Sequence, residues 1–141
     1  MKERTGNILN LNHGILVHSC DDMGGAHSAL LEPLRARYPG SYRTYKQAFD
    51  AGSLTLGRIE SYAVPSPTDD ILVVVPAVMQ RGEHVDLDAV QSCFLEVAKL
   101  ARARGLPVHV PVSAGGDWPA IAERIQATVG ADVEVHAWQS A

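Results

Sequence analysis

Residues 14–38 read GILVHSCDDMGGAHSALLEPLRARY, and this stretch decides the fold class of the chain. It opens with an apolar run, Ile15, Leu16 and Val17, that predicts a buried strand. A short loop of small and acidic residues follows, and the apolar positions after the loop recur at the spacing of a helix. A strand, a glycine loop and a helix in this order are typical of α/β proteins that present backbone N–H groups to an anionic ligand.

A second stretch repeats this order of elements. Residues 108–121 read VHVPVSAGGDWPAI, an apolar strand followed by a glycine loop and the start of a helix. In an open α/β sheet, ligands bind beyond the carboxyl ends of the strands, where both loops begin. The pair of loops therefore predicts one site for a phosphate-bearing ligand. Ordinary tight turns are the alternative for each loop, because glycine also simply turns a chain.

Length and composition place the chain among ordinary globular proteins. With 141 residues, 46% of them hydrophobic and 20% charged, we expect one domain spanning residues 1–141 with a single core. The net charge of −4 argues against a general nucleic-acid-binding surface. Cys20 and Cys93 have neither zinc-site nor disulfide spacing, which indicates a reducing compartment. No apolar run reaches the roughly 18 residues of a membrane span, so we expect no contact with a membrane. We also expect a cytoplasmic monomer that needs no metal or cofactor.

Apolar periodicity along the chain predicts alternating strands and helices. Strands are expected at Asn7–Leu11, 15–18, Leu54–Leu56, Arg58–Val64, Ile71–Met79, Val108–Val112 and Val133–Trp138, and helices after the first loop as far as Tyr38, from Ser41 to Gly52, from Asp86 to Gly105 and from Trp118. This order predicts an α/β fold, a three-layer α/β/α sandwich around a mixed central sheet.

Two features of these elements give sharper predictions. The continuous apolar character of Ile71–Met79 and Val108–Val112 predicts interior strands. Two prolines predict local irregularity. Pro33 indicates a helix that kinks or starts late, and Pro76 indicates the end of a strand or an interruption of its ladder.

Several segments, taken in order, resemble the macro domain family, whose members bind ADP-ribose. They are Gly6–Leu9, Val17–Asp21, Met23–Ala26, Tyr45–Gly57, Val74–Gln80 and Val110–Trp118. The segment Met23–Ala26 is similar to the family's Met-Gly-x-Gly loop, and Val110–Trp118 is similar to its second phosphate loop. Tyr45–Gly57 looks like a segment of the branch that removes ADP-ribose from acidic side chains or DNA bases.

The chain also departs from the family's pattern. Ala26 replaces a glycine, His27 replaces an apolar residue, and Gln80 stands where the deglycosylating branch carries a catalytic lysine. The resemblance therefore implies an ADP-ribose-binding hydrolase of ADP-ribosyl linkages on protein or nucleic acid, with two alternatives. One is a non-catalytic reader or sequestering module, and the other is a phosphatase acting on ADP-ribose 1''-phosphate.

The resemblance implies a set of site residues. The expected ligand-binding residues are Asn7, Ile8, Cys20, Asp21, Met23, Gly24, Gly25, Ala26, His27, Gln80, Ser113, Ala114, Gly115, Gly116, Asp117 and Trp118. Asn7 stands where the family has an adenine-binding aspartate, and the alternative is that it only begins a strand. Asp117 is the first catalytic candidate and Asp21 the second, although Asp117 is also placed to cap a helix. Because Asp21 and Asp22 are adjacent in an extended chain, only one of them is expected to face the cleft.

Overall fold

The computed structural model describes residues 1–24, 31–112 and 117–140. These residues form a seven-stranded sheet in the order β1-β7-β6-β2-β4-β3, with β5 paired to β4. The strands are β1 (Lys2–Thr5), β2 (Gly14–Asp21), β3 (Tyr62–Ala63), β4 (Leu72–Arg81), β5 (His84–Val85), β6 (Val108–Pro111) and β7 (Val135–Gln139). The helices are α1 (Leu31–Arg37), α2 (Pro39–Asp50), α3 (Leu87–Arg104) and α4 (Trp118–Val129), with a short 3₁₀ helix at Ile8–Asn10.

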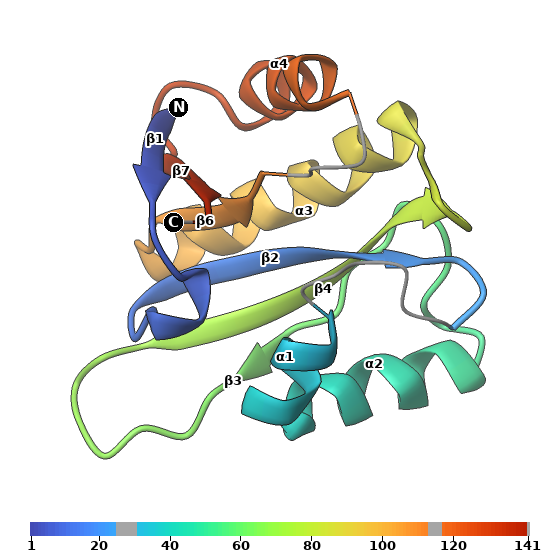
Figure 1. Cartoon of the computed structure of the whole chain (residues 1–141), viewed down its shortest axis with the longest axis horizontal. Helices are drawn as coiled ribbons and strands as arrows, with labels where there is room; N and C mark the ends of the chain where they lie inside the picture. Colours follow the sequence, from blue (N-terminus) through green and yellow to red (C-terminus); the bar gives the residue numbers. More distant parts are fainter. Residues whose placement is uncertain (25–30, 113–116, 141) are drawn as a thin grey trace.

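The elements form three layers. Helices α3 and α4 cover one face of the sheet, while α1 and α2 lie on the other face (Figure 1). β1, β7, β6, β2 and β4 run parallel to one another. β3 and β5 pair antiparallel with β4, so the sheet is mixed. The structure confirms the predicted α/β/α sandwich.

The two strands predicted to be interior do lie inside the sheet. β6 lies between β7 and β2, and β4 lies between β2 and β3. Every residue of β4 from Leu72 to Gln80 is buried, as expected for a strand covered by helices on both faces.

Pro76 does not end β4, which continues to Arg81. The Pro76 carbonyl accepts a hydrogen bond from Glu60 N at 3.0 Å, and Val78 N donates to Arg58 O at 2.9 Å. These groups face residues 58–60 rather than β2, and the missing N–H of Pro76 lies on that same side. The ladder with β2 therefore continues past the proline, while regular β3 pairing is limited to two residues.

Helix α3 follows its sequence signals closely. The Asp86 carboxylate caps its first turn by accepting from Ala89 N at 2.9 Å, and Gly105 ends it in the left-handed conformation with φ 64°. Its apolar residues recur at helical spacing and form one stripe that is buried against the sheet: Val90, Cys93, Phe94, Val97, Ala98 and Ala101.

Two predicted strands at the start and middle of the chain are wrong, and a third is correct only in part. Asn7–Leu11 is not a strand, because its alternating residues form the 3₁₀ helix that buries Ile8. The first strand is instead β1, which is exposed and polar and forms by main-chain pairing with β7. Leu54–Leu56 is not a strand, and only Tyr62–Ala63 of the predicted Arg58–Val64 is one.

The helices on the α1–α2 face begin at other residues than expected. The first helix ends before Pro39 as expected, with α1 stopping at Arg37, and Pro39 then opens α2 with Tyr38 as N-cap. Ser41 is therefore not the N-cap; it lies in the first turn and is buried. Pro33 lies within the described part of α1, Leu31–Arg37, and residues 25–30 before it are outside the described part of the chain, so whether this helix starts late stays a prediction.

Candidate functional site

The candidate site lies at the carboxyl ends of three neighbouring parallel strands. β2 pairs with β4 on one side and with β6 on the other, so the segments that follow Asp21 and Pro111 leave neighbouring parallel strands. Asp21 lies opposite Gln80 of β4 in the sheet register. In Figure 1 these ends of β2 and β4 lie to the right. Such an edge is where open α/β sheets bind ligands.

The two adjacent aspartates at the end of β2 have different partners. Asp21 is only 1% exposed, and its Oδ1 accepts from Met23 N at 2.9 Å. Asp22 Oδ1 accepts instead from Gly82 N, at 3.3 Å, in the turn between β4 and β5. Asp21 therefore shapes the start of the first loop, whereas Asp22 ties that loop to the neighbouring turn.

Gln80 is held in one orientation by its neighbours. Ser19 Oγ donates to Gln80 Oε1 at 2.6 Å, and Gln80 Nε2 donates to Gly82 O at 3.5 Å. A neutral amide in this setting cannot act as an amine nucleophile or carry a positive charge. Gln80 can orient a ligand or water but cannot do the chemistry of a lysine.

Gly24 at the start of the first loop lies against Phe49 of α2. Gly24 has φ 75°, and a Cβ added there would lie 2.7 Å from Phe49 Cε1. Glycine is required at this position by both the backbone conformation and the neighbouring ring. The adjacent Met23 is 74% exposed.

Asp117 lies at the start of α4, directly after the second loop. Its exposed carboxylate caps the helix by accepting from Ala120 N at 3.3 Å. Trp118 is half-buried and packs against the core between the sheet and α3. At the start of α4, the Trp118 side chain therefore packs on the core, while the Asp117 carboxylate faces solvent.

Asn7 lies at the same edge of the sheet but away from β2. Gly6 N donates to Gln139 O at the end of β7, so Asn7 directly follows the pairing of β1 with β7. Asn7 Oδ1 accepts from Leu9 N at 3.0 Å and caps the 3₁₀ helix. Ile8 is buried in the core with Leu16, so its side chain serves packing.

Cys20 is a buried thiol rather than a nucleophile. It is 2% exposed and packs with Tyr45, Leu54 and Val78. Burial, together with the nearby Asp21, raises the pKa of the Cys20 thiol far above its ordinary value. Its Sγ lies 3.7 Å from Nδ1 of His18, which is uncharged because burial lowers its pKa to about 4.

The remaining expected site residues lie outside the described part of the chain. They are Gly25, Ala26, His27, Ser113, Ala114, Gly115 and Gly116. Sequence reasoning overlooked Ser19, Gly82 and the role of Phe49 beside Gly24. Only Ser19 carried a signal, since residues two apart in a strand share a face and Asp21 was already a candidate.

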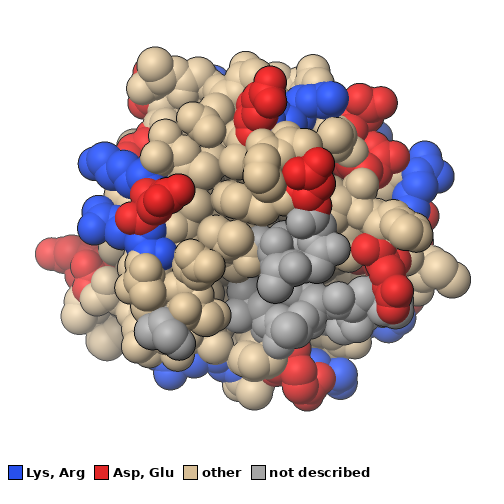
Figure 2. Space-filling view, turned by 45° about the horizontal axis from the view of Figure 1, so that its top comes forward, with Lys and Arg blue, Asp and Glu red and all other residues tan. Residues whose placement is uncertain are grey.

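Charge on the visible face is mixed. In Figure 2, Lys and Arg side chains are interspersed with Asp and Glu rather than gathered into one basic patch. Among the described residues, no group of three or more His, Cys, Asp or Glu side chains is placed to hold a metal ion. Within residues 1–24, 31–112 and 117–140, no helix is long and apolar enough to cross a membrane.

No protein-family model matches the chain, and no curated protein sequence matches it either. Solved structures do match it. A protein from Bacteroides thetaiotaomicron superposes with a TM-score of 0.85 at 22% sequence identity, over 99% of each chain. A macrodomain protein from Streptomyces coelicolor gives a TM-score of 0.82 at 19% identity, over 97% of each chain. Thermosipho africanus DarTG, solved in complex with ADP-ribose, gives 0.80 at 14% identity, over 98% of this chain and 41% of its own. With its mixed sheet between two helical layers, the chain therefore has the macrodomain fold.

Proposed function

We propose that this chain binds ADP-ribose at the carboxyl edge of β2, β4 and β6 and hydrolyses ADP-ribosyl linkages on protein or nucleic acid. One observation carries the binding proposal. The two glycine loops leave adjacent parallel strands, in a fold whose Thermosipho africanus representative was solved with ADP-ribose. A diphosphate is well suited to such an edge, because backbone N–H groups and a helix N-terminus attract anions.

The hydrolysis would release ADP-ribose by attack of water on the anomeric carbon of the distal ribose. Positive charge develops on the ribose in such a reaction, and a carboxylate can stabilise that charge or take a proton from the attacking water. Asp117 is exposed at the start of α4, and Asp21 is buried at the end of β2. Asp117 is the better candidate, because a carboxylate open to solvent can reach both water and substrate.

Binding without catalysis is the second candidate function. Gln80 favours it, since its amide is bonded to Ser19 and Gly82 and supplies no amine for a lysine-type mechanism. A reader or sequestering module would bind free or attached ADP-ribose and release no product. A phosphatase acting on ADP-ribose 1''-phosphate is the third. The single-domain organisation, the cytoplasmic location and the monomeric state stay predictions.

ADP-ribose should bind at least about tenfold more tightly than AMP or ribose 5-phosphate. The reason is that a diphosphate engages both loops, whereas either fragment engages one end of the site. Calorimetric titration with the three compounds measures this difference. Incubation with ADP-ribosylated protein, ADP-ribosylated DNA and ADP-ribose 1''-phosphate then separates hydrolase, reader and phosphatase. Equal affinity for all three compounds, or no heat with any, would refute the binding proposal.

Replacing Gly24 by alanine should weaken ADP-ribose binding by about tenfold. The new Cβ meets the Phe49 ring at 2.7 Å in a backbone conformation that alanine disfavours, so the first loop must move. The measurement is the Kd by calorimetry. Gly52→Ala is the matched control: Gly52 has the same φ of 75°, and an added Cβ meets no described atom within 4 Å. This control should lose about 1 kcal/mol of stability and keep its affinity.

A double variant tests the stated cause of the Gly24 effect. In Gly24→Ala with Phe49→Leu, the ring that the new Cβ meets is gone, and part of the affinity should return. If Gly24→Ala binds as well as the wild type, the first loop does not position the ligand.

A further inference from the structure

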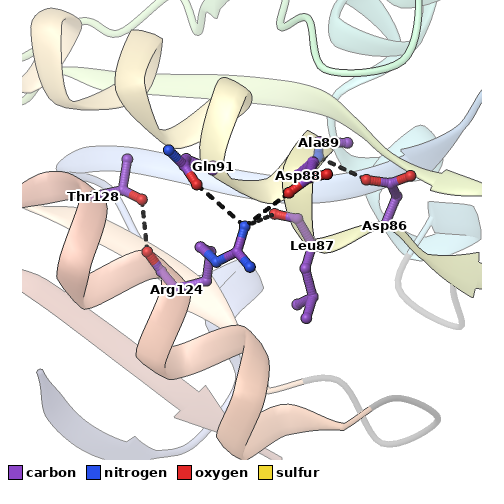
Figure 3. A network of polar contacts seen from close by, with 7 residues as sticks. All are labelled: Asp86, Leu87, Asp88, Ala89, Gln91, Arg124 and Thr128. Atoms are coloured by element: carbon purple, nitrogen blue, oxygen red, sulfur yellow. Dashed lines mark hydrogen bonds and ion pairs between the residues drawn. The ribbon is translucent and has the colours of Figure 1, made fainter.

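Arg124 of α4 makes a compact polar junction with the start of α3. Its Nη1 lies 3.2 Å from Leu87 O, 3.1 Å from Asp88 Oδ1 and 3.1 Å from Gln91 Oε1. Figure 3 shows the guanidinium pointing from α4 into the first turn of α3, where these three oxygens converge. Nη1 carries two hydrogens for three acceptors, so one hydrogen is shared.

The acceptors differ in how firmly they hold Arg124. The Asp88 side chain is 96% exposed, so its ion pair with Arg124 contributes little in water. The Leu87 carbonyl belongs to the backbone of α3 and cannot move away. Arg124 itself is only 31% exposed along its side chain. The junction is therefore anchored mainly on the Leu87 backbone carbonyl, and it fixes α4 relative to the first turn of α3.

The first turn of α3 is itself tied to the first loop. Asp86 caps α3, and its Oδ2 lies 3.2 Å from Arg81 Nε at the end of β4. One residue further on, Gly82 N donates to Asp22. A continuous series of polar contacts and chain neighbours thus runs from Asp22, through the start of α3, to Arg124. On α4, Arg124 lies two turns after the Asp117 cap.

We propose that Arg124 is a positioning residue for the site: it holds the first turn of α4, with Asp117 and Trp118, in register with the first loop. This inference rests on the proposed function. The apolar contact of Trp118 sets the depth of α4, and Arg124 resists its sliding along α3. A ligand that bridges both loops then meets groups that need no rearrangement, which improves affinity.

Arg102 offers a matched control at the far end of the same helix pair. From the last turn of α3, Arg102 Nη2 donates to Val129 O at 2.6 Å, and its Nε donates to Asp132 Oδ2 at 2.7 Å. Arg102 therefore ties the end of α3 to the end of α4, as Arg124 ties α3 to α4 near the site. Both are arginines bonded to a backbone carbonyl and an exposed aspartate, and they differ in distance from the strand carboxyl ends.

The experiment compares Arg124→Met with Arg102→Met, since methionine keeps part of the apolar stem and removes the donors. Arg124→Met should weaken ADP-ribose binding by at least about tenfold and should speed hydrogen exchange of the Ala120 amide, which Asp117 caps. Arg102→Met should lower the melting temperature by about as much as Arg124→Met does. It should leave the affinity for ADP-ribose and the hydrogen exchange of the Ala120 amide unchanged. Gln91→Ala, which removes one exposed acceptor, should shift both readouts in the direction of Arg124→Met by a smaller factor.

The two readouts separate this inference from the proposed function. If the wild type binds no ADP-ribose, the proposed function fails, while the exchange of Ala120 still tests the role of Arg124. Equal effects of the two arginine substitutions on affinity and exchange would overturn the inference. So would an Arg124→Met protein with wild-type exchange at Ala120.

Discussion

Lowering the pH from 7 to 5 should destabilise the folded chain by roughly 2 kcal/mol for each of two buried histidines. His18 and His109 are 4% and 7% exposed. The pKa of each is lowered from 6.5 to about 4, mainly by burial and, for His109, also by the neighbouring His136. In the unfolded chain both titrate near 6.5, so between pH 6.5 and 4 the unfolded state binds more protons. The stability present above pH 6.5 is therefore lost as the pH falls towards 4.

The contacts of His109 explain why it resists protonation. Trp138 Nε1 donates to His109 Nδ1 at 2.9 Å, so that nitrogen must be an acceptor. The His109 ring also stacks on His136 with centroids 4.9 Å apart, and Arg4 Nε donates to His136 Nδ1. Glu134, 3.4 Å from His136 Nε2, is the acidic group on this side. A proton on His109 Nδ1 would face the indole N–H, and a second positive charge would lie close to Arg4.

Urea unfolding at pH 7, 6 and 5 measures this effect. His109→Gln should reduce the pH dependence of the free energy of unfolding by about half, because glutamine does not titrate. Its side-chain carbonyl can still accept the hydrogen bond from Trp138. The exposed His84 provides the control, and His84→Gln should follow the wild-type curve. A His109→Gln protein that loses stability with pH as steeply as the wild type would contradict the assignment.

The parts of the fold that could be predicted are those in which local pattern and burial agree. β4 is apolar at successive positions, and it lies in the middle of the sheet with both faces covered. α3 has a capping aspartate, a stripe of buried residues and a terminal glycine, each of which is a local signal. β1 could not be predicted, because Lys2–Thr5 has no apolar alternation and owes its conformation to hydrogen bonds with β7. The prediction of a strand at Asn7–Leu11 was wrong because its apolar residues alternate as they do in a strand, whereas the structure buries Ile8 in a 3₁₀ helix.

For the candidate site too, some features could be predicted from the sequence and others could not. The loops and the Asp117 cap follow from residues next to one another in sequence. The contacts that position the site are long-range: Ser19 meets Gln80 across 61 residues, and Arg124 meets Gln91 across 33. A single sequence does not show which residues form such pairs, because nothing in it places Ser19 beside Gln80 or Arg124 beside Gln91. Gly24 could be read as a loop glycine, but its contact with Phe49 depends on where α2 lies.

Replacing Asp117 by asparagine should reduce the hydrolysis of ADP-ribosyl linkages by at least about 100-fold while ligand binding survives. Asparagine can cap α4 as aspartate does, by accepting from Ala120 N, but it cannot take a proton or stabilise positive charge on the ribose. Asp117→Ala, in contrast, should cost about 1 kcal/mol of stability through loss of the cap. Release of ADP-ribose from modified protein measures the rate, and calorimetry measures the affinity.

The comparison of these variants separates the structural role of Asp117 from a catalytic one. If Asp117 only caps α4, activity should fall in the alanine variant in proportion to unfolding and return in the asparagine variant. If it activates water, both variants should be inactive, although only the alanine variant is destabilised. Gln80 cannot supply an amine nucleophile, so a carboxylate would have to carry the reaction. An Asp117→Asn protein with wild-type turnover would therefore leave Asp21, buried beside the first loop, as the residue to replace next.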